Sequence, residues 1–237
     1  MFTIINKQML AKGIKRIDVL ADEIAPVVQP GQFVMVVPTE KSEWIPLSVV
    51  EADATRGTIA LIFQERGPST LELGAVPINE SLFAVMGPFG RPATIRMSGC
   101  VVCVSAGVGI ASMLPICRAL RRAENKVISV LGARNKRSLL LEPQMRLTSH
   151  RLVVATEDGS AGRKGLATDL LGEVLRKENA ALVYAVGPVP LMREAVALAR
   201  GMGIPSLVQV NSVMHCGSGI CGSCRLEVAK KDRKSVV

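Results

Sequence analysis

Three cysteines near the end of the sequence have a spacing that suits metal chemistry. Cys216, Cys221 and Cys224 form the pattern C-x4-C-x2-C, and glycine or serine fills most of the gaps between them. This is the ligand spacing of a plant-type 2Fe-2S loop, whose backbone must fold tightly around the cluster. A zinc knuckle or a disulfide-rich tail is the alternative, but zinc sites usually repeat a C-x2-C pair. We therefore predict that residues 212–237 form a 2Fe-2S cluster-binding segment.

The predicted cluster lacks one ligand in this sequence. Four thiolates normally hold such a cluster, and no cysteine follows Cys224. Residues 225–229 and 235–237 have the pattern of a hairpin, whose second strand would deliver a fourth ligand just past the last residue. Otherwise Asp232, His215 or a side chain of a partner would have to replace it.

Composition predicts a globular chain that binds acidic ligands. The 237 residues are 49% hydrophobic, enough for a sizeable core in two medium domains or one large one. The net charge of +9 suits nucleic acid, acidic cofactors or an acidic partner. Because aromatic residues make up 3% and no nucleic-acid motif is present, we expect phosphate-bearing cofactors and a partner protein, and no nucleic acid.

One uncharged stretch, Met97 to Cys117, is long enough to raise the hypothesis of a membrane span. Its interior instead has the pattern of a buried strand at Cys100–Val104, a glycine turn, and a helix from Ile110. We therefore expect no membrane span. The start of the sequence has no signal-peptide pattern, and free thiols with a cluster motif favour the cytoplasm.

The first domain is predicted to be a small antiparallel barrel over residues 1–95. Short strands alternate with turn clusters, which is typical of such barrels. Gly67-Pro68-Ser69-Thr70 opens a short helical stretch, where hydroxyl and N–H groups suit either a phosphate or a plain N-cap. The predicted strands are Met1–Leu10, Ile14–Leu20, Gln32–Val37, Leu47–Glu51, Thr58–Gln64 and Ser81–Val85.

The second domain is predicted to be a Rossmann-like α/β unit over residues 96–211. Gly87-Pro88-Phe89-Gly90-Arg91-Pro92 breaks the strand pattern and marks the boundary. Strands that alternate with helices imply a parallel sheet. The predicted strands are Val101–Val104, Lys126–Leu131, Leu152–Thr156, Ala181–Val186 and Ser206–Val210, with helices at Ala111–Glu124, Leu140–Leu147, Thr168–Glu178 and Pro190–Gly201.

Four loops of small residues follow the predicted parallel strands, at residues 105–109, 132–135, 157–160 and 187–190. Ligands bind at the carboxyl ends of such strands, and the first loop has glycines where backbone would approach a phosphate. We predict a nucleotide cleft at this edge.

Cys100 and Cys103 form a second C-x2-C pair. Positions three apart in a strand point to opposite faces, so we do not expect a redox pair. Cys117, on the following helix, is expected in the core.

The ordered set of barrel, nucleotide domain and cysteine loop resembles the ferredoxin reductase superfamily. It is most similar to the family of electron-transfer subunits of type B dihydroorotate dehydrogenase and to their relatives, the small subunit of NADH-dependent ferredoxin:NADP oxidoreductase and the sulfide dehydrogenase-like flavoproteins. The resemblance rests on residues 45–48, 62–64, 67–70, 87–90, 107–111, 132–135, 158–160, 187–190 and the three cysteines.

This resemblance implies which residues contact the cofactors. Bound FAD would lie against Ile45, Pro46, Leu47, Ser48, Ile62, Phe63 and Gln64, with Gly67, Ser69 and Thr70 near its pyrophosphate. NAD(P)H would dock on Gly107, Gly109, Arg134, Asp158, Gly187 and Pro188. Ser48 is the implied catalytic residue, placed to hydrogen-bond the reactive edge of the flavin. Two positions differ from relatives within this superfamily. An arginine is common where Ile45 stands. The ferredoxin:NADP branch has aspartate where Cys216 stands, so the cysteine here favours the dihydroorotate branch.

The implied function is an electron-transfer subunit that passes electrons between NAD(P)H, FAD and a 2Fe-2S cluster, to or from a catalytic flavoprotein of pyrimidine biosynthesis. Ferredoxin is a further implied partner. One alternative is a ferredoxin:NAD(P) reductase, stand-alone or a small subunit; another is a nucleotide-sensing regulatory subunit without turnover. The choice of NADH or NADPH stays open, since Arg134, Lys136 and Arg137 would either contact a 2'-phosphate or form a solvated charge cluster.

Overall fold

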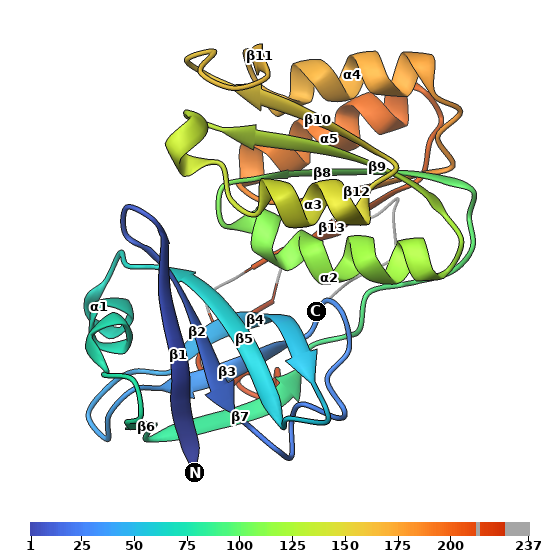
Figure 1. Ribbon diagram of the computed structural model, residues 1–237. Helices are drawn as coiled ribbons and strands as arrows, with labels where there is room; N and C mark the ends of the chain where they lie inside the picture. Colours follow the sequence, from blue (N-terminus) through green and yellow to red (C-terminus); the bar gives the residue numbers. More distant parts are fainter. Residues whose placement is uncertain (212–213, 226–237) are drawn as a thin grey trace. The chain divides into compact units, whose positions relative to one another are not determined.

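The computed structural model describes residues 1–211 and 214–225 (Figure 1). Contacts divide the described chain into two compact units, one of residues 1–93 with residues 210–211 and 214–225, the other of residues 94–209. The predicted hairpin at 225–229 and 235–237, and Asp232 with it, lie outside the described residues except for Arg225. The separate cluster-binding segment therefore stays a prediction.

The first unit is a seven-stranded antiparallel sheet that is nearly closed into a barrel, which confirms the predicted fold class. Its strand order is β6-β1-β2-β5-β4-β3-β7. Strand β6 pairs with β1 and β7 pairs with β3, while Phe83 alone separates β6 from β7, so the chain itself joins the two edges. The strands are β1 (Phe2–Ala11), β2 (Ile14–Leu20), β3 (Phe33–Val37), β4 (Ile45–Asp53), β5 (Thr58–Gln64), β6 (Ser81–Leu82) and β7 (Ala84–Phe89).

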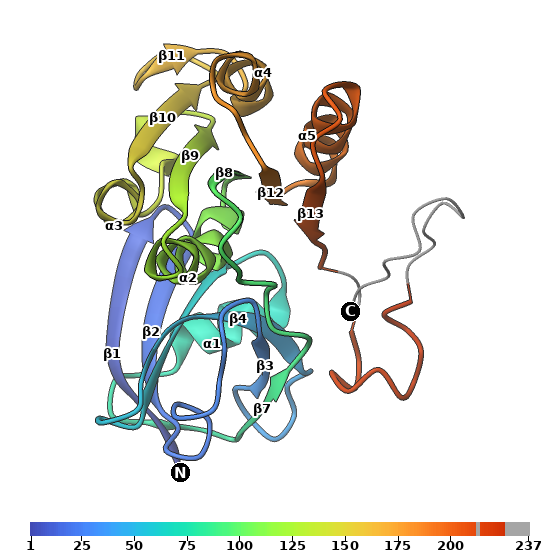
Figure 2. The same ribbon diagram turned by 90° about the vertical axis from the view of Figure 1, so that its right-hand side faces the viewer.

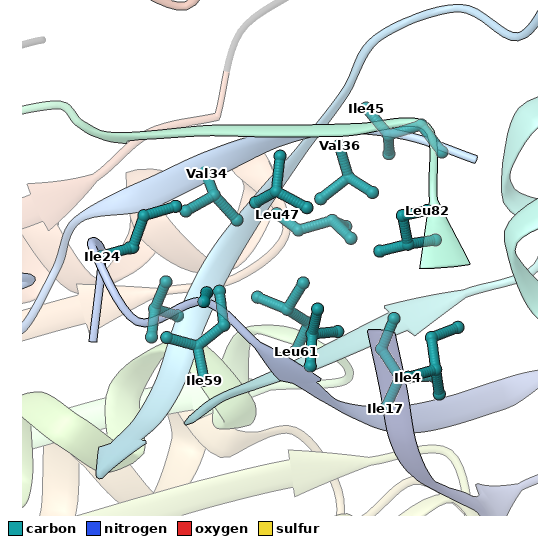
Figure 3. Close-up of a cluster of buried hydrophobic side chains, with 14 of the residues drawn as sticks. Ile4, Ile17, Ile24, Val34, Val36, Ile45, Leu47, Ile59, Leu61 and Leu82 are labelled. Atoms are coloured by element: carbon teal, nitrogen blue, oxygen red, sulfur yellow. The ribbon is translucent and has the colours of Figure 1, made fainter. Parts of the chain in front are cut away.

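The barrel core consists of alternate residues along each strand. Val34 and Val36 of β3 face inward, as do Ile45 and Leu47 of β4 and Leu61 of β5 (Figure 3). Because side chains of a strand alternate between faces, the residues between them must point out of the barrel. The alternation therefore fixes which residues of β3 and β4 can meet a ligand or another segment.

Two details of the predicted barrel are wrong. The single strand expected at Ser81–Val85 is two strands, because its halves pair with opposite edges of the sheet. The glycine-proline motif expected to break the strand pattern lies partly inside β7, where Gly87 and Pro88 sit at a register shift opposite β3. A bulge absorbs these residues without ending the strand, so β7 runs on to Phe89.

A helix lies between β5 and β6. Helix α1 (Pro68–Ala75) is the short helical stretch that the Gly67-Pro68-Ser69-Thr70 motif is predicted to open. The ammonium groups of Lys7 and Lys15 each donate to the carbonyl of Gly74, at 3.0 Å. Cations at a helix C-terminus satisfy its last carbonyls and its dipole, so the two lysines fix the direction in which the N-terminus of α1 points.

The second unit is a parallel sheet with helices on both faces, as predicted (Figure 2), but it has six strands where the sequence predicts five. The strand order is β11-β10-β9-β8-β12-β13. Helices α2 and α3 pack against each other, as do α4 and α5. The elements are β8 (Cys100–Ala106), α2 (Gly109–Arg122), β9 (Lys126–Ala133), a 3-10 turn (Lys136–Ser138), α3 (Glu142–Thr148), β10 (Arg151–Thr156), β11 (Arg163–Lys164), α4 (Ala167–Lys177), β12 (Leu182–Val186), α5 (Val189–Gly201) and β13 (Ser206–Gln209).

The central strand β8 separates the two cysteines of the second C-x2-C pair. Cys103 is fully buried and Cys100 is partly exposed, and in the described chain no cysteine forms a disulfide. A hydrogen bond with Cys117, together with burial, raises the pKa of the Cys103 thiol. A protonated, buried thiol is inert, so these residues belong to the core. No helix in the described chain is long and apolar enough to cross a membrane.

Candidate functional site

The topology of the parallel sheet creates a switch point between β8 and β12. From β8 the chain first adds β9 and β10 on one side, then returns to add β12 and β13 on the other. Nucleotides bind at such a point, outside the carboxyl ends of the strands. The loops there contain Gly107, Gly109, Gly187 and Pro188, so the structure brings four of the predicted nucleotide-binding residues together.

This part of the site is made of closely packed backbone. A Cβ atom on Gly109 would lie 2.7 Å from the Cα of Gly187 and 2.8 Å from the carbonyl oxygen of Val186. Gly107 has φ +58°, in the left-handed region that favours glycine. A side chain at Gly109 would separate the two loops, and one at Gly107 would be strained by its left-handed backbone, so the geometry favours glycine at both positions.

The N-terminus of α2 lies in the same loop and has no side-chain cap. Its first turn has no acidic residue, and Ile110 is the first residue whose N–H bonds back to the loop, to Gly107. Uncapped N–H groups at a helix N-terminus bind anions. The arrangement fits a pyrophosphate of a dinucleotide.

The other two predicted nucleotide residues lie in neighbouring loops that bond to each other. The N–H of Asp158, after β10, donates to the carbonyl of Arg134, after β9, at 3.3 Å. Hydrogen bonds from the hydroxyl and N–H of Ser160 lower the pKa of Asp158. Arg134 is exposed. The two loops are thus joined through their backbones, and one carries an exposed cation and the other a firmly ionised carboxylate.

Strand β4 divides the predicted flavin residues between two faces. Ile45 and Leu47 are each 7% exposed and belong to the barrel core (Figure 3), so their side chains face away from any outside ligand. Pro46 is exposed and Ser48 is partly exposed. Among the described residues the Ser48 hydroxyl has no hydrogen-bond partner, which leaves it available to a cofactor.

Strand β5 divides its predicted residues in the same way. Phe63 lies in the barrel core, while Ile62 and Gln64 point to the opposite face. Ile62 is 4% exposed and Gln64 is partly exposed. On this strand the side chains of Ile62 and Gln64 are therefore the ones directed out of the barrel.

The N-terminus of α1 could bind a phosphate through its second residue, Ser69. The Thr70 hydroxyl accepts from the N–H groups of Arg66 and Gly67, at 2.9 and 3.1 Å, and donates to the Gly67 carbonyl. Thr70 therefore serves as the cap. The Ser69 hydroxyl has no partner in the described chain, and the first turn has no acidic residue. Ser69 and the free N–H groups of the first turn are the phosphate-binding candidates.

The cysteine loop brings together two of the three predicted metal ligands. The sulfur atoms of Cys216 and Cys221 lie 3.3 Å apart. The Ser218 hydroxyl donates to the Cys216 sulfur at 3.4 Å and is the main cause that lowers the pKa of Cys216 to about 6. A thiolate is the metal-binding form of cysteine, so Cys216 is the ligand candidate that the loop favours in this form.

The third predicted ligand is not grouped with the pair. Cys224 is 6% exposed, and within the described chain no three candidate ligands converge on one point. His215 is exposed, and it is not part of such a group either. In the described residues two of the predicted ligands are thus close together, and the metal site itself stays a prediction.

The sequence did not single out the surface on which this loop rests. Gly217 lies against Met35 of β3 and Phe89 of β7, and the Phe33 and Phe89 rings have centroids 6.0 Å apart. One signal was present: β3 has the sequence Phe-Val-Met-Val-Val, apolar on both faces. A strand that is apolar on both faces is covered on both faces.

Two features together are typical of an oxidoreductase of the ferredoxin reductase class. One is a barrel with an outward hydroxyl and a helix N-terminus, and the other is a parallel sheet whose glycine loops meet at a switch point. A model of the oxidoreductase NAD-binding domain matches residues 103–197. The chain is 35% identical to the electron transfer subunit homolog of dihydroorotate dehydrogenase B (NAD(+)) from Thermotoga maritima, over 95% of this chain and 80% of that protein. It belongs to the family of dihydroorotate dehydrogenase B electron transfer subunits.

Further comparisons agree with this assignment. A probable electron transfer subunit of the same enzyme from Methanopyrus kandleri is 37% identical, over 84% of this chain and 74% of that protein. The solved NADH-dependent reduced ferredoxin-NADP oxidoreductase, described for flavin-based electron bifurcation, has a TM-score of 0.90 and 34% identity over 95% of this chain and 81% of its own. A cytochrome P450 reductase from Amycolatopsis shares the fold, with a TM-score of 0.73 at 18% identity over 89% of this chain and 69% of its own.

Proposed function

We propose that this chain takes electrons from NADH and passes them through FAD and a 2Fe-2S cluster to a catalytic flavoprotein partner. One observation carries the proposal: Ser48 and the cysteine loop lie on the same outer face of the barrel. Ser48 pairs with Phe33 across β3 and β4, Pro46 pairs with Met35, and Gly217 of the loop rests on Met35. The flavin-facing hydroxyl and the metal-binding loop are thus one strand apart.

The residues of the barrel have separate roles in this scheme. When bound, a flavin links the two-electron chemistry of a nicotinamide to the one-electron chemistry of an iron-sulfur centre. Ser69 and the first N–H groups of α1 hold the pyrophosphate, with Lys7 and Lys15 fixing the helix from its other end. The Ser48 hydroxyl orients the reactive edge of the ring system.

The cysteines would divide between the two irons of the cluster. Cys216 and Cys221, with sulfurs 3.3 Å apart, suit one metal ion, because tetrahedral thiolates about 2.3 Å from a metal are separated by about 3.8 Å. Cys224 would hold the second iron together with a ligand that the described residues do not supply. Free thiols and a cluster require a reducing compartment, so we place the protein in the cytoplasm.

The loops after β9 and β10 favour NADH over NADPH. An acidic residue that accepts from the ribose hydroxyl is the usual mark of NAD recognition. Hydrogen bonds from Ser160 keep Asp158 ionised, and a charged carboxylate repels a 2'-phosphate. The relatives named for NAD(+) agree with this choice.

The names of the relatives support a dihydroorotate dehydrogenase B catalytic subunit as the partner and a place in pyrimidine biosynthesis. The likeness to the reduced ferredoxin-NADP oxidoreductase favours ferredoxin as a second candidate partner. Mixing experiments with either protein would decide between them.

A spectroscopic experiment tests the central proposal. The protein is purified without oxygen, and flavin, iron and acid-labile sulfide are counted per chain. We expect one FAD per chain and iron with sulfide after reconstitution, and we expect NADH to bleach the flavin absorption. A colourless chain that does not bind added FAD would overturn the proposal.

A further inference from the structure

The outer face of β3 carries an apolar side chain that is almost fully buried. Val34 and Val36 point into the barrel core, so Met35 between them points outward, and yet it is 1% exposed. Its cross-strand neighbour on β7, Met86, is 49% exposed on the same face. A segment must therefore cover Met35 and leave Met86 open.

The covering segment includes the cysteine loop. A Cβ atom on Gly217 would lie 2.6 Å from Cγ of Met35, 3.2 Å from its sulfur and 3.0 Å from Cδ2 of Phe89. Gly217 also has φ +69° and is itself buried. Two independent requirements, a left-handed backbone and direct contact with Met35, thus meet at one glycine.

A second glycine of the same loop meets just one of these requirements. Gly219 has φ +84°, but no atom lies within 4 Å of the place where its Cβ would be. Ile220 beside it is 90% exposed. One side of the loop therefore rests on the barrel at Gly217, and the other side faces away from it.

We propose that Gly217 is a positioning residue that seats the metal-binding loop on Met35 and Phe89, and so sets the distance from the Cys216 ligand to the barrel face that bears Ser48. The proposal rests on the proposed function for its consequence, since it assumes that the loop carries the cluster. The seat itself is a contact between residues of this chain. A methyl group on Gly217 lifts the loop, because the nearest atoms leave no room for it.

Methionine oxidation tests the seat without any cofactor. The full chain, free of cluster, is treated briefly with hydrogen peroxide, and sulfoxide at Met35 and Met86 is measured by mass spectrometry. In the unmodified protein Met35 reacts much more slowly than Met86. Gly217→Ala should raise the rate at Met35 about tenfold, the size of change that an overpacked contact produces in an equilibrium. Gly219→Ala, which has the same backbone strain, should leave Met35 protected.

A rescue variant separates the contact from backbone strain. Met35→Ala removes the side chain that the added methyl group would strike. Gly217→Ala combined with Met35→Ala should therefore retain more iron than Gly217→Ala alone after reconstitution, and the rate of cluster reduction by NADH, followed by electron paramagnetic resonance, should recover. Bleaching of the flavin by NADH should be the same in all variants.

The outcomes distinguish the two proposals. Equal effects of Gly217→Ala and Gly219→Ala, or rapid oxidation of Met35 in the unmodified chain, would overturn the seat while leaving electron transfer intact. If Met35 is protected in the unmodified chain and becomes exposed in Gly217→Ala, the seat is supported. If that same chain retains no iron, the cluster is refuted.

Discussion

The nucleotide edge of the parallel sheet and the outer face of the barrel are built in opposite ways. At the sheet edge the site is backbone, with Gly109 against Gly187 and an uncapped helix N-terminus behind them. On the barrel face the site is side chains, with Ser48 and Met35 on neighbouring strands. At Gly109 the sheet edge therefore leaves no room for an added atom, whereas the site on the barrel face depends on which residues point outward.

The largest loss of function is expected at the sheet edge. Gly109→Val would place atoms inside the backbone of Gly187 and Val186, which cannot move aside as a side chain can. We expect a loss of about 3 kcal/mol in unfolding free energy and loss of NADH binding, measured by urea denaturation and by titration. Gly201→Ala in α5, where no atom lies within 4 Å, is the control. Wild-type binding by the Gly109 variant would show that the loops are not in contact.

The next prediction tests which side chains of β4 point into the barrel and which point out of it. Leu47→Ala removes a side chain from the barrel core and should cost about 2 to 5 kcal/mol of unfolding free energy. Pro46→Ala, one residue away but exposed, should change it by about 0.5 kcal/mol or less. Chemical denaturation of both variants measures the difference. Similar losses would mean that the inward and outward faces are assigned wrongly.

A smaller effect is expected for the hydroxyl on the barrel face. Ser48→Ala removes a hydrogen-bond donor and should slow flavin reduction by NADH about tenfold, the value of one hydrogen bond. Stability should hardly change, because Ser48 is partly exposed. Ser48→Thr keeps the hydroxyl and should retain the rate in anaerobic stopped-flow experiments. Unchanged kinetics in the alanine variant would remove Ser48 from the mechanism.

The smallest effect is expected at the opposite edge of the parallel sheet. Glu178 accepts from Lys126 at 2.8 Å and from Arg151 at 3.1 Å, and these cations hold its pKa below the usual 4.5. A depressed folded-state pKa contributes stability above the unfolded pKa, and that stability is lost as the pH falls through the folded value. Glu178→Gln should therefore lower the melting temperature slightly at pH 7.

Two controls complete this experiment. The difference in melting temperature between Glu178→Gln and the unmodified chain should vanish once acid protonates the carboxylate. NADH affinity should be unaffected, because Glu178 follows the C-terminal end of α4 and its partners begin β9 and β10, away from the nucleotide loops. A change in NADH affinity would contradict the contrast between the two edges.

The second unit could be predicted from the sequence almost element by element. Buried parallel strands are continuous apolar runs and their helices have a 3.6-residue period, so both signals are local. The predicted helix Pro190–Gly201 begins one residue after the observed start, and the predicted strand Ala181–Val186 one residue before it. The pairing of β11 with β10 was not predicted, since two residues carry no periodic signal.

For the flavin and metal sites, the sequence could predict which segments take part, but not which of their side chains are exposed to a ligand. The motif at 45–48 marked the correct strand, yet half of its side chains lie inside the barrel. The cysteine spacing marked the loop, but its seat on Met35 joins residues far apart in the chain. Both the outward direction of a side chain on β4 and the seat of the cysteine loop depend on pairing between strands, and the sequence alone does not show which strands pair.

Local patterns of residue size and polarity in the sequence specify the alternation of strands and helices, the glycine loops of the nucleotide edge and the cysteine spacing. The tertiary structure alone decided that Ser48 faces outward, that β6 and β7 close the barrel, and that Gly217 rests on Met35. The physical reason is that strand register and side-chain contact are set by partners that meet only when the chain has folded.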